Sequence, residues 1–385
     1  MRVLHLFSNW RWTGPAEPAV NLCAALRGRG VEVQFACGQE PSSRDNAVRR
    51  RATELGLTVL QGYLLHKHFA PLASRRDARE IAAALAAPPD IIHSHLIGDH
   101  GVALRIARRL SPRPRVVRSF YVADTVEAPI RTRRALAGGT DAAIAPCRIG
   151  AELIGKRLGF SPERIALIEV GIDTERFNPE RPLPDARAEL GLVAGEPVLG
   201  IIARIQGHRR YPAFIEAVAV AAKSVPNLKV LVLGRGPQKE RLALAPARRL
   251  GVADRFVFSD YRWGDDFVAA VACFDACVFL VPGTDGTCRA IREAMAMGKP
   301  VIASRRGIVP ELIEDGRTGL IVDGSVESLS RAIISLLSDP ARRRTIGEAA
   351  RAEALRRFPL VLQAERVCAL YEALLAGRAP AEAAR

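Results

Sequence analysis

Short apolar segments alternate with helical segments along the whole chain, a pattern typical of parallel β-sheets whose faces are covered by helices. In the first half, strands are expected near residues 3–7, 31–36, 91–93, 115–119, 142–145 and 165–169. A second series is expected near residues 198–203, 229–233, 256–259, 276–281, 300–303 and 320–322. The alternation therefore predicts an α/β protein with two doubly wound parallel sheets in tandem.

A proline-rich stretch separates the two series of strands. It covers residues 177–184, with the sequence FNPERPLP, and reads as an interdomain linker. Residues 1–178 are therefore expected to form one Rossmann-like domain and residues 185–357 a second, which a chain of 385 residues with 49% hydrophobic residues can support. Ligands of such sheets bind beyond the carboxyl ends of the strands, so we expect the site in a cleft between the two domains.

The chain is strongly basic, with a formal net charge of +15, and 50 of its 56 basic residues are arginine. The basic clusters lie at residues 49–51, 75–76, 131–134 and 342–344, without the interleaved aromatic residues of a single-strand binder, so no nucleic-acid partner is expected. Two interpretations stay open, namely solvated helix faces and attraction to an anionic membrane surface. No run of 18 apolar residues occurs, and the first ten residues read as a strand rather than a signal peptide. We therefore expect a cytoplasmic protein. If its basic residues are attracted to anionic lipid, it would be held at the inner face of the cell membrane.

The sequence lacks the common motifs for metals and cofactors. Its seven cysteines show no CxxC spacing and read as buried reduced thiols. Asp-x-Asp is absent, and Gly298-Lys299-Pro300 lacks the Ser or Thr that ends a phosphate loop. We therefore expect metal-independent chemistry without a cofactor.

The most informative local pattern lies between Asp285 and Glu293. Residues 276–281 read as a buried strand, residues 282–286 as a tight loop and residues 287–297 as a helix. Backbone N–H groups at a helix N-terminus bind phosphate, and two carboxylates separated by seven residues can accept bonds from separate sugar hydroxyls. The pattern predicts a ligand site, the alternative being an ordinary strand, loop and helix with a solvated glutamate.

This stretch, with the tail Ala294-Met295-Ala296-Met297-Gly298-Lys299-Pro300-Val301-Ile302-Ala303, resembles the acidic-x7-Glu signature of family 4 of the retaining GT-B glycosyltransferases. The family usually begins the signature with Glu-Gly-Phe-Gly, whereas this chain has Asp285, Gly286, Thr287 and Cys288, followed by Arg289. The resemblance implies a GT-B fold, with two Rossmann-like domains facing across a cleft. It also implies that a C-terminal helix, at about residues 358–385, crosses back to the first domain.

Two further matches lie in the first half of the chain. Residues 13–17, which include Gly14 and Glu17, resemble the family's Gly-Gly-x-Glu, with Pro15 removing one N–H donor. Residues 90–95 resemble Asp-Val-Val-His-x-His, and of the two histidines, which should face the same side, we favour His95 as a contact to the donor sugar. Trp10 and Trp12 are interpreted either as an acceptor platform or as caps of the domain edge.

The second half supplies the expected donor site. Arg204 and Arg209 resemble the family's Arg and Lys, and would neutralise the diphosphate as the leaving group departs. Gly234 lies in a loop that resembles Gly-x-Gly-Pro, and residues 256–263, with Tyr261 and Arg262, occupy the place where the family binds the nucleotide base.

The resemblance implies a retaining glycosyltransferase that moves a sugar from a nucleotide-diphosphate donor, of UDP or GDP type, to a saccharide or lipid-linked acceptor in glycoconjugate or polysaccharide biosynthesis. Roles are expected as follows: catalysis by His95, Arg204, Arg209, Asp285 and Glu293; donor binding by Gly14, Gly234, Tyr261, Arg262, Gly286, Thr287, Cys288 and Arg289; acceptor binding by Trp10, Trp12 and Glu17. With no convincing nucleophilic carboxylate, a front-face route is favoured, in which the leaving phosphate oxygen takes the acceptor proton.

Two other classes of function stay open. A GT-B epimerase or phosphorylase would share the phosphate site, and a weakly active or inactive homologue would act as a binding partner. The second is suggested by departures from the family pattern at Pro15, Arg209, Asp285 and residues 287–289.

Overall fold

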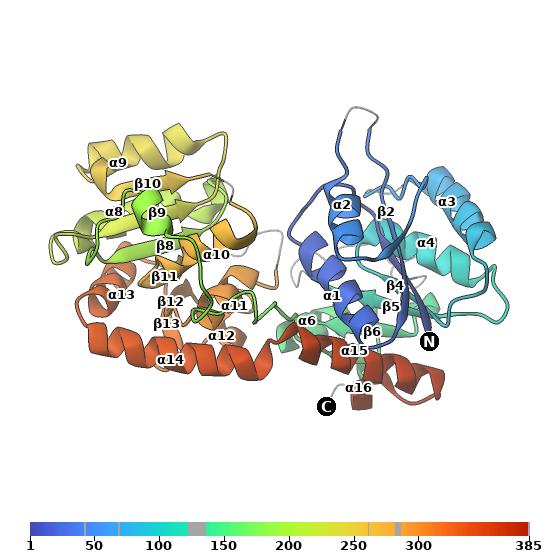
Figure 1. The fold of residues 1–385 in the computed structure, drawn as a ribbon. Coiled ribbons are helices and arrows are strands. Elements are labelled where there is room, and N and C mark those ends of the chain that lie inside the picture. The colour runs from blue at the N-terminus through green and yellow to red at the C-terminus, as the bar shows by residue number, and fades with distance from the viewer. Residues whose placement is uncertain (42–43, 68–69, 122–135, 261, 282–285, 384–385) are drawn as a thin grey trace. The chain divides into compact units, whose positions relative to one another are not determined.

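The computed structural model describes residues 1–41, 44–67, 70–121, 136–260, 262–281 and 286–383. The chain divides into two compact units: the first unit contains residues 1–171, 284–287 and 360–385, and the second unit contains residues 172–283 and 288–359. Each contains one parallel sheet, and the two sheets confirm the predicted α/β architecture (Figure 1).

The first unit contains a seven-stranded sheet in the order β3-β2-β1-β4-β5-β6-β7. Its strands are β1 (Arg2–Phe7), β2 (Glu32–Cys37), β3 (Thr58–Leu60), β4 (Ile91–Ser94), β5 (Arg115–Ser119), β6 (Ala142–Ala145) and β7 (Ile165–Leu167). Six of them match predicted strands, and β3 is an addition to the prediction.

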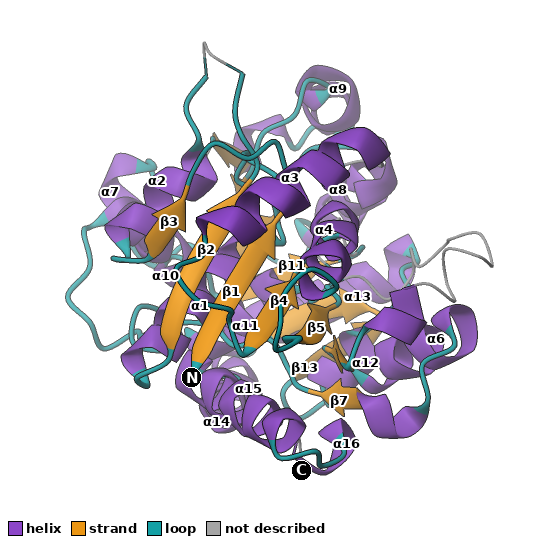
Figure 2. Ribbon diagram, turned by 90° about the vertical axis from the view of Figure 1, so that its right-hand side faces the viewer, coloured by secondary structure: helices purple, strands orange, loops and turns teal. Residues whose placement is uncertain are grey.

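Helices cover both faces of this sheet: α1 (Ala16–Gly28), α2 (Ala47–Glu54), α3 (Pro71–Ala84), α4 (Ile97–Ala107), α6 (Arg148–Leu158), α15 (Leu360–Leu375) and α16 (Pro380–Ala383). Side chains of β1 alternate between the faces, so Val3 and Phe7 join a core with α1 and α15, while Leu4 and Leu6 join a core with α3 and α4. Figure 2 shows β1, β2 and β4 side by side in the centre of the sheet. The C-terminal helix α15 packs against α1, so it belongs to the first unit.

The second unit contains a six-stranded sheet in the order β10-β9-β8-β11-β12-β13. Its strands are β8 (Val198–Ile202), β9 (Lys229–Leu233), β10 (Phe256–Ser259), β11 (Ala276–Phe279), β12 (Val301–Ser304) and β13 (Gly319–Val322). All six correspond to predicted strands. The helices are α7 (Ala186–Glu189), α8 (Tyr211–Ala221), α9 (Ala245–Arg249), α10 (Gly264–Ala272), α11 (Arg289–Ala296), α12 (Val309–Leu312), α13 (Val326–Leu337) and α14 (Pro340–Arg357).

Local sequence signals explain several helix ends. The side chains of Ser325 and Asp339 accept hydrogen bonds from backbone N–H groups in the first turns of α13 and α14. Gly159 ends α6 in the left-handed conformation, with φ 76°. These caps satisfy backbone groups that a helix end leaves without partners.

The proline-rich stretch at residues 177–184 is packed rather than free. Phe177 is buried and meets Phe267 edge to face, and Arg181 forms an ion pair with Asp265 at 2.7 Å. The stretch therefore belongs to the second unit, and the division between the units falls between Gly171 and Ile172.

None of the described helices is long and apolar enough to cross a membrane.

Candidate active site

The second sheet has a topological switch point between β8 and β11. These strands are neighbours in the sheet, and the chain builds outward from them in opposite directions. In open α/β sheets, ligands bind beyond the carboxyl ends of the strands at such a point. The residues that follow β8 and β11 are therefore the first place to look for a donor site.

Two of the predicted diphosphate ligands follow β8. Arg204 comes two residues after the strand and is exposed. Arg209 lies in a short turn, and its guanidinium Nη1 donates a hydrogen bond to the backbone carbonyl of Val281, which follows β11. Arg209 thus ties the end of β11 to the segment after β8, which places one cation at the switch point.

Gly234 follows β9, and its lack of a side chain is a packing requirement. A Cβ atom there would lie 2.1 Å from the backbone oxygen of Ala203, so only glycine lets the loops after β8 and β9 approach this closely. Gly234 therefore shapes the loop next to Arg204.

The start of α11 carries four of the predicted donor ligands. Thr287 and Cys288 are buried, Gly286 is half-buried, and Cys288 precedes the helix in the left-handed conformation with φ 53°. The helix begins at Arg289, two residues later than predicted, because Cys288 is not helical. Asp285 and Tyr261 lie outside the described residues.

Glu293 is buried and forms an ion pair with Arg289, one helical turn earlier, at 3.0 Å. The side chain of Glu293 is 3% exposed and that of Arg289 is 27% exposed, so the carboxylate is held by a cation that itself reaches solvent. Arg289, which is expected from the sequence to bind the donor, therefore has a structural partner in the same helix.

Arg262 is engaged within the second unit. Its two terminal nitrogens donate to the carboxylate of Glu189 at 3.1 and 2.8 Å, and its Nε donates to Ser259 at 2.6 Å. The hydrogen bonds from Arg262 lower the pKa of Glu189 below its usual value. This bidentate pairing gives Arg262 a structural role that the sequence did not predict.

In the first unit, the predicted acceptor residues lie at the start of α1 and just before it. Trp12 packs against the core beneath α1, whereas Trp10 is half-buried with the guanidinium groups of Arg11 and Arg44 at 4.7 and 5.8 Å from its ring. Pro15 is the N-cap of α1, and Glu17 lies in its first turn, where a carboxylate complements the helix dipole. Gly14 is half-buried in the same loop.

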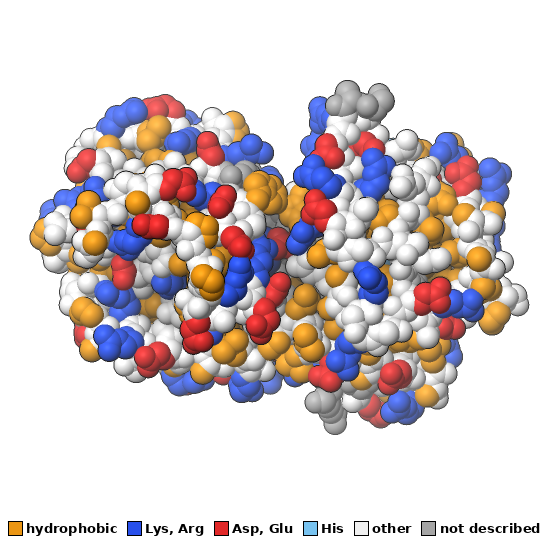
Figure 3. All heavy atoms as spheres, in the orientation of Figure 1, with side chains coloured by type: hydrophobic (Ala, Val, Ile, Leu, Met, Phe, Trp, Pro, Cys, Tyr) orange, Lys and Arg blue, Asp and Glu red, His pale blue; other side chains and the backbone are white. Residues whose placement is uncertain are grey.

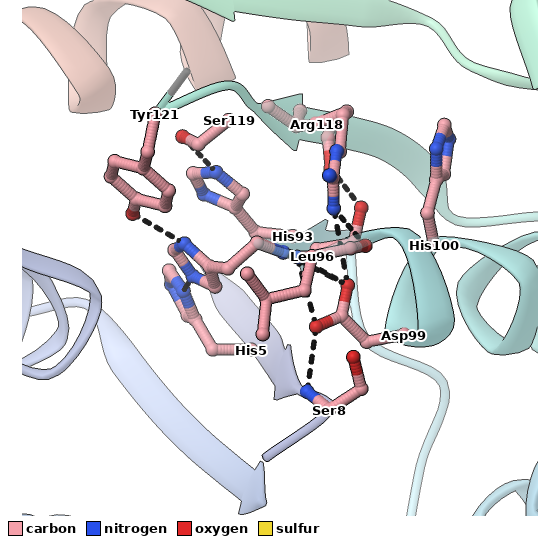
Figure 4. A network of polar contacts seen from close by, with 12 residues as sticks. His5, Ser8, His93, Leu96, Asp99, His100, Arg118, Ser119 and Tyr121 are labelled. Carbon is pink, nitrogen blue, oxygen red and sulfur yellow. Dashed lines mark hydrogen bonds and ion pairs between the residues drawn. The ribbon is translucent and has the colours of Figure 1, made fainter. Parts of the chain in front are cut away.

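His95 directly follows β4 and lies in a cluster of buried polar side chains (Figure 4). His93 and His95 stack with ring centroids 4.5 Å apart, so the two face the same side, as predicted. Nδ1 of His95 lies 2.7 Å from the Tyr121 hydroxyl, and Nε2 lies 3.0 Å from Nδ1 of His5. Burial lowers the pKa of His95 well below its usual value and that of His5 to about 3, so both rings are neutral at pH 7.

Asp99 and Arg118 form the second part of this cluster. Asp99 accepts backbone hydrogen bonds from Ser8, His95 and Leu96 at 2.7 to 3.1 Å and lies 3.3 Å from the Arg118 guanidinium. Burial raises the pKa of Asp99 to about 6 and lowers that of Arg118 to about 10, against the mutual attraction of the two groups. The carboxylate therefore fixes the backbone on which His95 sits.

Sequence reasoning did not identify His5, Asp99, Arg118 or Tyr121. One signal was available for His5, which interrupts the apolar strand Val3-Leu4-His5-Leu6-Phe7. The other three contacts depend on tertiary structure.

Among the described residues, His5, His93 and His95 form a group that could hold a metal ion, with candidate ligand atoms within 4.8 Å of one another. The rings of His93 and His95 are nearly parallel, with an interplanar angle of 16°, and those of His5 and His95 with 19°. Nε2 of His95 and Nδ1 of His5 lie 3.0 Å apart, a hydrogen-bond distance, so these two nitrogens already pair with each other. The trio therefore fits hydrogen bonding better than metal ligation.

Comparison with known proteins gives two family matches that together span most of the chain. Residues 14–176 match Glycosyltransferase Family 4, and residues 184–353 match Glycosyl transferases group 1. Among curated relatives, a GDP-mannose-dependent alpha-(1-6)-phosphatidylinositol monomannoside mannosyltransferase from Mycolicibacterium smegmatis is 31% identical over 297 residues, which cover 74% of this chain and 68% of that protein. The sulfoquinovosyl transferase SQD2 of Arabidopsis thaliana is 30% identical over 74% of this chain and 56% of its own length. A D-inositol 3-phosphate glycosyltransferase from Corynebacterium glutamicum is 32% identical over 56% of this chain, and that match spans about half (53%) of its own length.

Solved structures share the fold along nearly the whole chain. A glycosyltransferase from Rickettsia africae has a TM-score of 0.85 at 16% identity and covers 97% of this chain and 98% of its own. Anabaena Alr3699/HepE, solved in complex with UDP, has a TM-score of 0.78 at 19% identity and covers 98% of this chain and all (100%) of its own. Two family models match this chain, and the mannosyltransferase relative is matched over more than two thirds of its own length. The chain therefore belongs to family 4 of the glycosyltransferases, also called the group 1 glycosyl transferases, and is a transferase enzyme with a GT-B fold.

Proposed function

We propose that the protein transfers a sugar from a nucleotide-diphosphate donor to a hydroxyl acceptor, with retention at the anomeric carbon and without a metal ion. The observation that carries this proposal is the hydrogen bond from Arg209 to the carbonyl of Val281, which holds a cation at the switch point of the second sheet. A diphosphate gains negative charge as the sugar departs, and a fixed guanidinium offsets that charge.

The other residues of the second unit fit the same donor. Arg204 is exposed beyond the same strand and adds a second positive charge. The backbone N–H groups that open α11 suit a phosphate, and Glu293 suits ribose hydroxyls. Arg289 pairs with Glu293 at 3.0 Å, and ribose hydroxyls would add hydrogen bonds to the same carboxylate when the donor binds.

The names of relatives support a UDP or GDP donor. The Mycolicibacterium smegmatis relative is named as GDP-mannose-dependent, and HepE was solved with UDP and with UDP-glucose. In our proposal, the donor loses its sugar on the face that the acceptor hydroxyl attacks, and the leaving phosphate oxygen takes the acceptor proton. A covalent sugar adduct detected by mass spectrometry would contradict this front-face route.

We further propose that His95 meets the donor sugar, and that the residues near the start of α1 take part in binding a saccharide or lipid-linked acceptor. A relative named as a phosphatidylinositol monomannoside mannosyltransferase supports a lipid-linked acceptor. A cytoplasmic enzyme with such an acceptor would work at the inner face of the cell membrane.

A basic surface on α3 and α4 supports contact with anionic lipid. Arg75, Arg108 and Arg109 are exposed, and after burial their like charges are the causes that lower the pKa of Arg105. Leu72, 77% exposed, adds an apolar group on α3. On the face in Figure 3, basic and acidic side chains are interspersed, so net charge alone does not define such a surface.

Vesicle co-sedimentation tests this surface. A double charge reversal, Arg108→Glu with Arg109→Glu, should reduce binding to vesicles with anionic lipid, whereas Arg342→Glu with Arg344→Glu on α14 should not. Equal losses in both variants would contradict a role for α3 and α4.

The donor site is tested by calorimetry and thermal shift with UDP, GDP, ADP and their common sugar conjugates, with Mg²⁺ or with EDTA. One nucleotide should stabilise the wild type, by about 2.7 kcal/mol at a concentration 100 times its Kd, and this gain should be unaffected by EDTA. Glu293→Gln should reduce it, whereas Glu348→Gln, an exposed carboxylate on α14, should not. Binding of no nucleotide would overturn the proposal in favour of an inactive homologue.

Turnover completes the test. Incubation of the preferred donor with candidate acceptors should release nucleotide diphosphate, and the anomeric proton coupling of the product should show retention. Product formed from the donor alone, without acceptor, would indicate an epimerase instead.

A further inference from the structure

His95 is held through both nitrogens of its ring. The Tyr121 hydroxyl lies at Nδ1 and His5 lies at Nε2, and all three side chains are buried (Figure 4). Burial keeps both imidazoles neutral, and a neutral imidazole has one donor nitrogen and one acceptor nitrogen. The donors and acceptors along Tyr121, His95 and His5 can therefore be arranged in only two ways, with each group donating toward His5 or each donating toward Tyr121.

In the first direction, Tyr121 donates to Nδ1 of His95, and the Nε2–H of His95 donates to Nδ1 of His5. This leaves one buried group without a partner, the Nε2–H of His5, for which the described part of the chain provides no hydrogen bond. Every other atom of the three side chains that can donate is satisfied.

In the second direction, Nε2 of His5 has no donor and the Tyr121 hydrogen needs another acceptor. Ser119 also interacts with Tyr121, but its hydroxyl already pairs with Nε2 of His93 at 2.8 Å. The hydrogen could be passed on through Ser119 and His93 to the Tyr371 hydroxyl, which pairs with Nδ1 of His93. The hydrogen of Tyr371 would then have no acceptor among the residues that the structure describes. The second direction thus leaves two buried atoms unsatisfied instead of one, which disfavours it.

We propose that Tyr121 is a positioning residue that fixes His95 as the tautomer with its proton on Nε2. This inference rests on the proposed function, in which His95 meets the donor sugar, and it identifies the atom that does so. Both ring nitrogens of His95 are engaged, Nδ1 by the Tyr121 hydroxyl and Nε2 by His5; in this proposal a sugar or phosphate oxygen replaces Nδ1 of His5 as the acceptor of the Nε2–H. The other tautomer would present a lone pair at Nε2, which repels a phosphate oxygen and can only accept a hydrogen bond from a sugar hydroxyl, not donate one.

Nitrogen-15 NMR of protein labelled at histidine tests the tautomer directly, because protonated and bare ring nitrogens have widely separated shifts. Signals of His95 are assigned by their loss in His95→Gln. The wild type should show a bare Nδ1 and a protonated Nε2 at His95. A proton on Nδ1 of His95 in the wild type would overturn the proposal, and no variant or activity measurement is needed for that conclusion.

Tyr121→Phe removes the hydroxyl and keeps the ring. Both directions then leave one donor and one acceptor unsatisfied, so the two tautomers should become comparable in population. If only the Nε2–H form reacts while both bind the donor, kcat should fall at least twofold with the donor KM unchanged. Retention of a single Nε2–H tautomer in this variant would show that Tyr121 does not set it.

Thr140→Val is the matched control. It removes a buried hydroxyl that pairs with Nε2 of another buried histidine, His100, at 2.7 Å. It should change the signals of His100 and the stability of the protein, and leave the His95 tautomer and kcat unaltered. An equal fall of kcat in both variants would reduce Tyr121 to a structural residue.

The two proposals fail separately. If Tyr121→Phe mixes the tautomers and kcat does not change, the tautomer assignment holds and the role of His95 in transfer is wrong. If the protein transfers no sugar at all, the NMR result still decides the tautomer.

Discussion

The guanidinium of Arg118 lies 3.3 Å from the carboxylate of Asp99, and both side chains are buried in the first unit (Figure 4). Asp99 also accepts backbone hydrogen bonds from Ser8, at 2.7 Å, and from Leu96, at 2.8 Å, while Arg118 donates to the carbonyl of Leu96. Ser8 follows β1 and Leu96 lies just beyond β4, so one ion pair fastens the carboxyl ends of the two central strands.

Asp99→Asn should destabilise the protein more than Arg118→Met. The first change leaves a buried guanidinium without its counter-charge and turns an amide N–H₂ toward backbone donors, at a cost of about 3–5 kcal/mol. The second leaves the carboxylate with its backbone N–H partners. Urea unfolding of both variants measures the difference, and a larger loss in Arg118→Met would contradict the assigned roles.

Most strands could be predicted because each contains a short apolar run between turn residues. All six strands of the second sheet were anticipated, whereas β3, the segment Thr58–Leu60, was not; its three residues are exposed or half-buried, so burial alone does not decide it. The C-terminal helix that the family resemblance implies at about residues 358–385 corresponds to α15, Leu360–Leu375. The local sequence pattern was thus sufficient to predict an element wherever burial of its apolar residues determines whether it forms.

The surroundings of the candidate site could be predicted only in part. The alternation of His93 and His95 placed them on one side of the strand, and their stacked rings confirm it. That His5 would meet them depends on the register of β1 against β4, which pairs His5 with His93 and leaves no local trace in the sequence. The pairing of Arg262 with Glu189 likewise joins segments 73 residues apart.

Acid should destabilise the protein as the pH falls below about 6.5. Burial lowers the pKa of His93, His95 and His100 well below that value and the pKa of His5 from 6.5 to about 3. Because the folded protein excludes these protons, the unfolded chain binds more of them, and each histidine contributes a slope of about 1.4 kcal/mol per pH unit. Asp99, whose pKa is raised to about 6, offsets part of this loss of stability, because on acidification its carboxylate takes up a proton at a higher pH in the folded state than in the unfolded chain.

Chemical denaturation between pH 4 and pH 7 measures that slope. His100→Gln should reduce it by about 1.4 kcal/mol per pH unit, whatever its effect on stability at pH 7. A slope equal to that of the wild type would mean that His100 is not held neutral by the fold.

Gly234→Ala should destabilise the second unit by about 1–3 kcal/mol, because the new methyl group overlaps the backbone oxygen of Ala203 and forces two loops apart. Nucleotide affinity should fall with it, since Arg204 directly follows Ala203. Gly207→Ala is the control, because a Cβ atom at Gly207 meets no heavy atom within 4 Å. Thermal unfolding and nucleotide titration of both variants decide the point, and equal behaviour would remove the packing argument.

Cys288→Gly should be more stable than Cys288→Ala. The residue is buried and has φ 53°, a left-handed conformation that costs an L-residue about 1–2 kcal/mol and that glycine adopts freely. Both variants lose the sulfur atom, so their difference reports the backbone strain, which should favour glycine by about 1 kcal/mol.

Cys23, buried in the interior of α1, provides the opposite case. There the backbone is helical, and glycine should be less stable than alanine by about 1 kcal/mol. Urea unfolding of the four variants tests the reversal of order between the two sites. If alanine is the more stable replacement at both positions, the strain at Cys288 is too small to matter, and the usual glycine of the family at this position must be explained by close approach of a ligand instead.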